Sequence, residues 1–294
     1  MQAMVGWLVA RPQNAVLALA ATLLLPVLQI LSSVVMVLLV LRQGMRVAAI
    51  EGLVAGALLA LVALIVGASI PEIVVTVLIT WLPALLLAAV LRATRSLTLT
   101  MQVSVIATAL IVTVFHVVVG DPLAYWQTML TTMAEIAKEM GLHEQADVLV
   151  SEQALVAGQM TVLVAFFSWT LYTACFLVGY LLYRQLPAES GGFGRFCDLS
   201  FGRVIAVTMA LASMLALASS AVWAQNIAIL LFAVFWLQGL AIVHWMHAER
   251  NMPFFGVVAV YALMPILHVM LVMALAVLGY TDAWFRYRRL RQAR

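Results

Sequence analysis

Residues 42–68 read RQGMRVAAIEGLVAGALLALVALIVGA. Two arginines and one glutamate stand at the head of this stretch, which then continues without charge to Gly67. A run of about 20 mostly apolar residues predicts a transmembrane helix, because a helix of that length crosses the hydrocarbon core of a bilayer. We therefore expect residues 47–68 to span a membrane, with Arg42 and Arg46 at its edge.

The composition extends this expectation to the whole chain. Of the 294 residues, 66% are hydrophobic and only 9% are charged, and the mean hydropathy is +1.14. Soluble domains carry about 25% charged residues, so a chain this poor in charge could not cover its surface in water. A membrane β-barrel would alternate apolar and polar residues, which this chain does not do. The sequence predicts an all-α, polytopic transmembrane helical bundle, and its net charge of +3 is too small to indicate nucleic-acid binding.

Apolar runs follow one another along the chain and predict 8–10 membrane segments. They cover 14–41, 47–68, 72–91, 97–120, 155–183, 204–222, 225–246 and 254–284. Two runs have two interpretations. Run 14–41 crosses once or forms two short helices broken near Pro26–Ser33, and run 254–284 crosses once or breaks at Pro265. The side of each terminus stays open for the same reason.

The charged connections orient the chain. Arg92, Arg95 and the basic segment 184–203 belong in the cytoplasm by the positive-inside rule. Residues 121–152 then lie outside, with six acidic residues against the single base Lys138. This segment opens with Asp121-Pro122, a typical helix N-cap followed by proline. It predicts an amphipathic helix that either lies on the outer membrane face or caps the bundle.

Two stretches near the C-terminus resemble a known family. They are NIAILLFAVFWLQGLAIVHW, residues 226–245, and VLGYTDAWFRYRRLRQ, residues 277–292. An asparagine that opens a span, an aromatic followed by Gln-Gly, and a terminal Gly-x-x-Asp-x-Trp-x-x-x-Arg are similar to the YybS-like family of bacterial inner-membrane proteins. The resemblance implies no particular activity. Tyr280 departs from it, because an aliphatic residue is expected there.

The N-terminal half resembles a second group. PVLQILSSVVMVLLVLRQGMRVAAIEGLVAG, residues 26–56, is similar to the opening of the substrate-binding (S) subunits of energy-coupling-factor transporters and to MreD. This likeness implies an S-subunit-like transmembrane unit over 1–184 that contains six helices and the outer segment. A cytoplasmic loop over 185–203 and C-terminal helices with a basic tail over 204–294 would follow. A shared fold does not carry a function with it.

Polar side chains inside the spans are candidates for lining a cavity. Polar residues in lipid turn inward, toward a bundle interior or a water-filled space. The candidates are Gln29, Ser32, Thr108, His116, Gln159 and Tyr172. The alternative interpretation is that they form interhelical hydrogen bonds, each worth about 0.6 kcal/mol.

Other positions predict helix packing. Gly52 and Gly56 form a GxxxG pair, which allows two helices to approach closely, within this chain or in a homodimer. Asn226, Gln238 and Gly239 are the family-like positions of span 225–246 and fit the same role.

Charges near the predicted membrane edges form a third group. Glu51 fits an interfacial acid that pairs with Arg46, and the alternative is a role in proton coupling or partner docking. Asp282 is spaced for an i, i+4 pair with Arg286. The tail beyond it carries five arginines among aromatic residues, which indicates binding to anionic lipid. Arg42 joins this group of interfacial charges.

No pattern for catalysis or cofactor binding occurs. The sequence has no P-loop, GxSxG, HExxH or CxxC, and the pair His244 and His247 is too small a set for zinc. We expect a non-enzymatic protein without metal or cofactor. Its expected function is transport or the binding of a small molecule or lipid through the S-subunit-like core. The alternative is a scaffold or assembly factor that recruits a membrane-protein partner.

Overall fold

The computed structural model describes residues 2–25, 28–186, 192–219 and 221–288, and this part of the chain is helical with no strand. The helices are α1 (Gln2–Ala10), α2 (Pro12–Leu24), α3 (Gln29–Gln43), α4 (Met45–Val66), α5 (Ile70–Thr94), α6 (Leu97–Val119), α7 (Pro122–Glu139), α8 (His143–Ser151), α9 (Gln153–Tyr183), the 3₁₀ turn η2 (Phe196–Asp198), α10 (Gly202–Ser219), α11 (Val222–Ala233), α12 (Phe235–Ala248) and α13 (Phe254–Phe285). By length and composition, seven membrane-spanning candidates occur in these ranges, and α2 and α3 are shorter apolar helices. The all-α polytopic fold is therefore confirmed.

The chain forms two compact units. Unit 1 contains Met1–Met101 and Thr170–Arg195, and unit 2 contains Gln102–Trp169 and Phe196–Arg294. The boundary passes through α6 and α9, so each of these helices contributes one end to unit 1 and the rest to unit 2. The division differs from the expected one at residues 184 and 203, because spatial contact rather than chain order decides which helices pack together.

Helix α3 is the centre of unit 1. Every residue from Ser32 to Leu41 is buried, so the helix is enclosed on all sides rather than along one stripe. Helices α2, α4 and α5 pack against it. Gly179 of α9 also approaches α3, and a Cβ at this glycine would lie 2.7 Å from Val37 and 2.9 Å from the carbonyl oxygen of Val34. The run 14–41 therefore contains two short helices, as one of its two interpretations proposed.

A proline inside α5 leaves one backbone carbonyl of that helix without its usual hydrogen bond, and a side chain of α9 donates to this carbonyl instead. Pro83 lies inside α5 and has no N–H to donate to the carbonyl of Ile79, one turn earlier. The Tyr172 hydroxyl of α9 donates to this carbonyl oxygen at 3.0 Å. The polar group that proline frees in a membrane helix thus finds a partner inside unit 1, as the lack of water in hydrocarbon requires.

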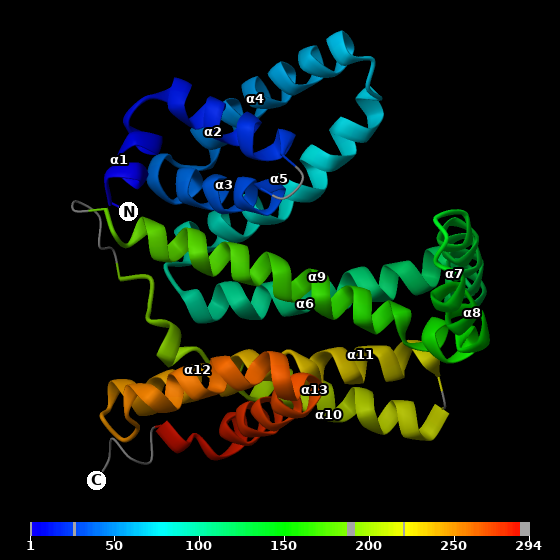
Figure 1. Cartoon of the computed structure of the whole chain (residues 1–294). Coiled ribbons are helices and arrows are strands. Elements are labelled where there is room, and N and C mark those ends of the chain that lie inside the picture. Colours follow the sequence, from blue (N-terminus) through cyan, green and yellow to red (C-terminus); the bar gives the residue numbers. More distant parts are fainter. Residues whose placement is uncertain (1, 26–27, 187–191, 220, 289–294) are drawn as a thin grey trace. The chain divides into compact units, whose positions relative to one another are not determined.

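The connection between α6 and α9 is helical, as predicted. Asp121 is the N-cap of α7, and its carboxylate accepts a hydrogen bond from the backbone N–H of Ala124 at 3.1 Å. Figure 1 shows α7 and α8 lying crosswise at the ends of α6 and α9. Trp126 of α7 donates to the Thr161 hydroxyl of α9 at 2.8 Å, which fixes α7 against the second of these helices.

Helix α13 reverses direction inside its length. His268 has φ 34° and ψ −111°, values that no helix accommodates, and it follows the internal Pro265. Figure 1 shows the ribbon folding back, so that the end of α13 lies at the same end of unit 2 as the end of α12. Each half is shorter than the about 20 residues of a full span. The break is at His268 rather than at Pro265, where the sequence suggested it.

The two ends of unit 2 carry opposite kinds of charge. Gln102 of α6 donates to the carbonyls of Ser200 and Phe201 at 3.3 and 3.0 Å, and His116, near the other end of α6, lies 3.3 Å from Asn226. Segment 196–201 therefore lies at the end opposite the acidic α7–α8 connection. Arg288 hydrogen-bonds to segment 196–201, so the arginines of the tail begin at this second end.

Candidate functional site

Two glycines bring α12 and the second half of α13 into close contact. A Cβ at Gly239 would collide with the carbonyl oxygen of Leu275, and a Cβ at Gly279 would collide with that of Phe235. Each glycine thus faces the backbone one turn before the other glycine, which is the geometry of two parallel helices that cross at small residues. Any larger side chain at either position would separate the helices.

Next to this crossing lies a buried polar network. Gln238 is fully buried and Asp282 is 3% exposed. The Gln238 amide donates to Asp282 Oδ2 at 2.8 Å, and the Arg288 guanidinium donates to the same oxygen at 2.8 Å. The amide oxygen of Gln238 accepts a hydrogen bond from the backbone N–H of Phe201. The network therefore joins α12, α13 and the segment that precedes α10.

Arg288 completes the network from beyond the end of α13. Its guanidinium also donates to the carbonyl oxygens of Cys197 and Leu199, both at 2.8 Å, and its side chain is 12% exposed. Arg286 makes this possible, because its positive φ of 51° ends the helix and turns the chain back. One arginine thus holds the C-terminal turn to the segment before α10.

The second oxygen of Asp282 distinguishes this network from a simple ion pair. Among the described residues, no donor reaches the buried Oδ1 atom. A buried carboxylate is costly to desolvate and is tolerated only with paired charge and hydrogen bonds. The network of Gln238, Asp282 and Arg288 can hold α12 and α13 in one relative position. Removing either donor leaves the Asp282 charge in an apolar interior with less compensation.

A family model described as "Predicted membrane protein (DUF2232)" matches residues 14–283. The chain belongs to this family. The match includes Gln238, Gly239, Gly279 and Asp282 and ends before Arg288. No curated protein and no solved structure matches the chain. The likenesses to S subunits, MreD and the YybS-like group therefore stay predictions, whereas membership in this membrane-protein family is established.

Two of the interfacial charges are placed differently from the sequence interpretation. Asp282 is buried, and its partner is Arg288 rather than Arg286, because the chain turns back after the helix and carries Arg288 underneath. Glu51 is 4% exposed rather than at an open edge. With its nitrogen turned toward the carboxylate, which is the orientation that satisfies both groups, the Gln43 amide donates to the two Glu51 oxygens at 3.0 and 3.2 Å. Arg46 is exposed, so the expected Glu51–Arg46 pair is not the arrangement observed.

The residues predicted to line one cavity separate into two groups. Gln29, Ser32 and Tyr172 belong to unit 1, and Thr108, His116 and Gln159 belong to unit 2. Thr108 donates to the carbonyl of Ser104 on its own helix. His116 Nδ1 lies 2.8 Å from the carbonyl oxygen of Val112, also on its own helix.

In unit 1 three of the polar side chains near the start of α3 hydrogen-bond to α2 and α5. The Ser32 hydroxyl donates to the carbonyl of Leu19 at 3.1 Å and accepts from the Trp81 indole at 2.7 Å. Ser33 donates to the carbonyl of Thr80 at 2.8 Å, and the Gln29 amide lies 3.5 Å from the Thr80 hydroxyl. These groups are satisfied within the protein.

The helix-packing positions occupy tight contacts inside the chain. A Cβ at Gly52 would lie 3.0 Å from Met36 and 3.6 Å from Trp81, so this face of α4 packs within unit 1. Gly56 faces the same indole at 3.9 Å. Asn226 contacts His116 as described above. The Gly52–Gly56 face is therefore occupied within the protein.

Sequence reasoning missed three residues that hold these contacts. Gly279 and Arg288 are the first and last residues of the quoted Gly-x-x-Asp-x-Trp-x-x-x-Arg pattern. That pattern was the sequence signal from which their roles could have been predicted. Arg92 was interpreted only as a topology marker, yet it donates to the carbonyls of Val40 and Leu41 at 3.2 and 2.8 Å. A cation that caps the last carbonyls of a neighbouring helix cannot be recognised without knowing which helices are neighbours.

Proposed function

We propose that the protein is a non-enzymatic membrane scaffold that holds partner proteins in the bilayer, and that it resides in a bacterial inner membrane. In this proposal residues 121–152 face outward and 184–203 face the cytoplasm. The basic tail binds anionic lipid on the cytoplasmic side, although residues 289–294 lie outside the described part of the chain.

The observation that carries the proposal is the filled interior of unit 1. Every residue of α3 from Ser32 to Leu41 is buried. The hydroxyls of Ser32, Ser33 and Tyr172 donate to backbone carbonyls of neighbouring helices. A transport pathway needs polar groups that face water or a substrate. In the described part of unit 1, the buried hydroxyls of Thr170 and Thr173 have no hydrogen-bond partner, but Ser32, Ser33 and Tyr172 are bonded to the protein itself. A core bonded in this way supports a protein that acts through its outer surface.

Thiol accessibility separates the scaffold from a transporter. We would replace Cys175 and Cys197 by alanine and then introduce Ser33→Cys in the interior or Glu72→Cys at the exposed start of α5. The scaffold predicts rapid reaction of a water-soluble methanethiosulfonate at position 72 and none at position 33. Equal reactivity at both positions would mean a water-filled pathway and would overturn the proposal.

Co-purification tests the partner directly. A scaffold extracted from its native membrane in mild detergent should elute with at least one other membrane protein in fixed ratio. Elution of the chain alone, from several detergents, would contradict the scaffold.

A further inference from the structure

Helix α7 has three faces rather than two. Leu130 and Ala134 are buried against the rest of unit 2. Polar residues occupy a second face, which includes Thr131 and Glu135. The third face is apolar and exposed, with Tyr125, Met129, Met133 and Ile136 at 41, 40, 50 and 50% exposure, and the C-cap residue Met140, 72% exposed, continues it. Their spacing of three and four residues places them in one stripe.

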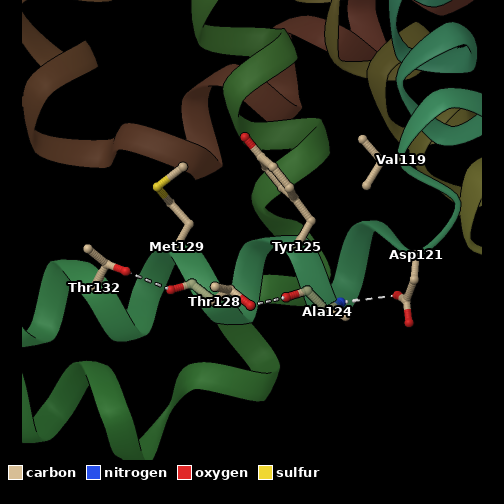
Figure 2. Close-up of a pocket in the computed structure, with 7 residues that line it drawn as sticks. All are labelled: Val119, Asp121, Ala124, Tyr125, Thr128, Met129 and Thr132. Carbon is tan, nitrogen blue, oxygen red and sulfur yellow. Dashed lines mark hydrogen bonds between the residues drawn. The ribbon is translucent and has the colours of Figure 1, made fainter.

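The stripe begins in a hollow at the elbow between α6 and α7. The hollow has a volume of about 480 Å³, and Val119, Tyr125 and Met129 supply its apolar wall. Figure 2 shows Tyr125 and Met129 pointing to the same side of α7 as Val119, the last residue of α6, while the Asp121 carboxylate turns toward the backbone N–H of Ala124 at the start of α7. The stripe therefore faces the side from which the spanning helix α6 arrives.

The position of α7 decides what can cover this stripe. Both α6 and α9 are long enough to span a membrane, and α7 lies crosswise at their ends (Figure 1), so it lies at the level of a membrane surface. The exposed side chains of Val117 and Val118 in the last turn of α6, 78 and 77% exposed, belong to the lipid-facing surface of that span. The stripe continues this surface through Val119.

We propose that the α7 stripe inserts into the lipid leaflet at which α6 ends, with acyl chains filling the elbow hollow. An interfacial helix buries its apolar face at the boundary between headgroups and acyl chains. The occupant is neutral or zwitterionic phospholipid, because segment 121–152 carries six acidic residues and one lysine, which would repel an anionic surface.

Fluorescence quenching in liposomes tests this placement. In the full chain with Cys175→Ala and Cys197→Ala, an environment-sensitive dye would be attached through Met133→Cys on the stripe, and through Glu135→Cys on the polar face as the matched control. The protein would be reconstituted in phosphatidylcholine with nitroxide-labelled lipid, and aqueous iodide would serve as the second quencher.

The expected result is a blue-shifted emission at position 133, with nitroxide quenching several-fold stronger than at position 135 and iodide quenching correspondingly weaker. Replacing part of the phosphatidylcholine with phosphatidylglycerol should not increase nitroxide quenching at position 133. Iodide quenching equal at both positions would overturn the proposal. Shielding of position 133 from both quenchers would also overturn it, since a protein surface rather than lipid would then cover the stripe.

Discussion

The Asp282 carboxylate accepts two hydrogen bonds on one oxygen, from Gln238 and from Arg288. Because the carboxylate is buried, both donors are needed to stabilise its charge. Gln238 and Arg288 each lie 2.8 Å from Oδ2, while Oδ1 has no donor among the described residues. A carboxylate that is 3% exposed cannot recover a lost partner from water. The pairing with Arg288 is therefore expected to matter far more than that of any surface ion pair, which is worth about 0–1 kcal/mol.

Replacing Arg288 by alanine should destabilise the protein by about 3–5 kcal/mol, because the buried Asp282 charge is left uncompensated. Thermal unfolding in detergent, followed by tryptophan fluorescence, measures this loss. Arg286→Ala is the matched control and should change stability little, since the Arg286 side chain is exposed. Asp282→Asn combined with Arg288→Ala should restore part of the loss. Equal effects of the two arginine variants would contradict the role assigned to Arg288.

The Tyr172 hydroxyl and Pro83 should be energetically coupled. Tyr172→Phe removes the donor to Ile79 and should cost about 1 kcal/mol. In a Pro83→Ala background the new N–H satisfies the Ile79 carbonyl within α5, so the same change should cost little. A double-mutant cycle on unfolding in detergent gives the coupling. If the effects of Tyr172→Phe and Pro83→Ala on stability were additive, the Tyr172 hydroxyl would not be stabilising the Ile79 carbonyl that Pro83 leaves without a donor.

At the scale of elements, the crossing of α12 and α13 depends on two glycines. Gly239→Ala places a methyl group against the Leu275 carbonyl oxygen and should destabilise by about 1–3 kcal/mol or more. Gly158→Ala in α9 is the matched control, because no atom lies within 4 Å of its added Cβ. That control should be neutral or stabilising by up to about 1 kcal/mol, from helix propensity alone. Thermal unfolding in detergent measures the stability of both variants. A Gly239→Ala variant as stable as the unaltered protein would exclude the close crossing of α12 and α13.

The reversal within α13 shows why hydropathy alone misjudges an element. By composition and length α13 qualifies as one span, yet non-helical angles at His268 divide it into two short helices. Proline inside an apolar run signalled a break. It could not give the position, because the residue at which the backbone leaves the helix depends on the contacts of both halves with α12.

At the scale of the whole molecule, the layout of unit 2 predicts which connections share a membrane side. Single cysteines introduced as Glu249→Cys and Arg286→Cys, without the native cysteines, should react with a membrane-impermeant maleimide from one side of sealed vesicles. Glu139→Cys in α7 should react from the other side. The three native residues are exposed, so labelling reports sidedness. Reaction of positions 286 and 139 from the same side would exclude the reversal at His268.

The sequence by itself determined the class of the molecule and several local features. Hydrophobicity and scarce charge required helices in lipid, because only internally hydrogen-bonded structures survive there. The Asp121 N-cap also followed from local chemistry. For the apolar runs 14–41 and 254–284, the sequence left both a single crossing and a break open.

Only the tertiary structure decided which apolar helix is central and which polar residues meet. A helix enclosed by protein, such as α3, and a helix that faces lipid have the same apolar composition, since lipid tails and a protein core are equally apolar. Asp282 and Arg288 meet because the chain turns at Arg286, and Gln238 joins them because Gly239 and Gly279 allow two helices to touch. Gln238 and Asp282 are 44 residues apart in the chain, and no local pattern encodes such a contact.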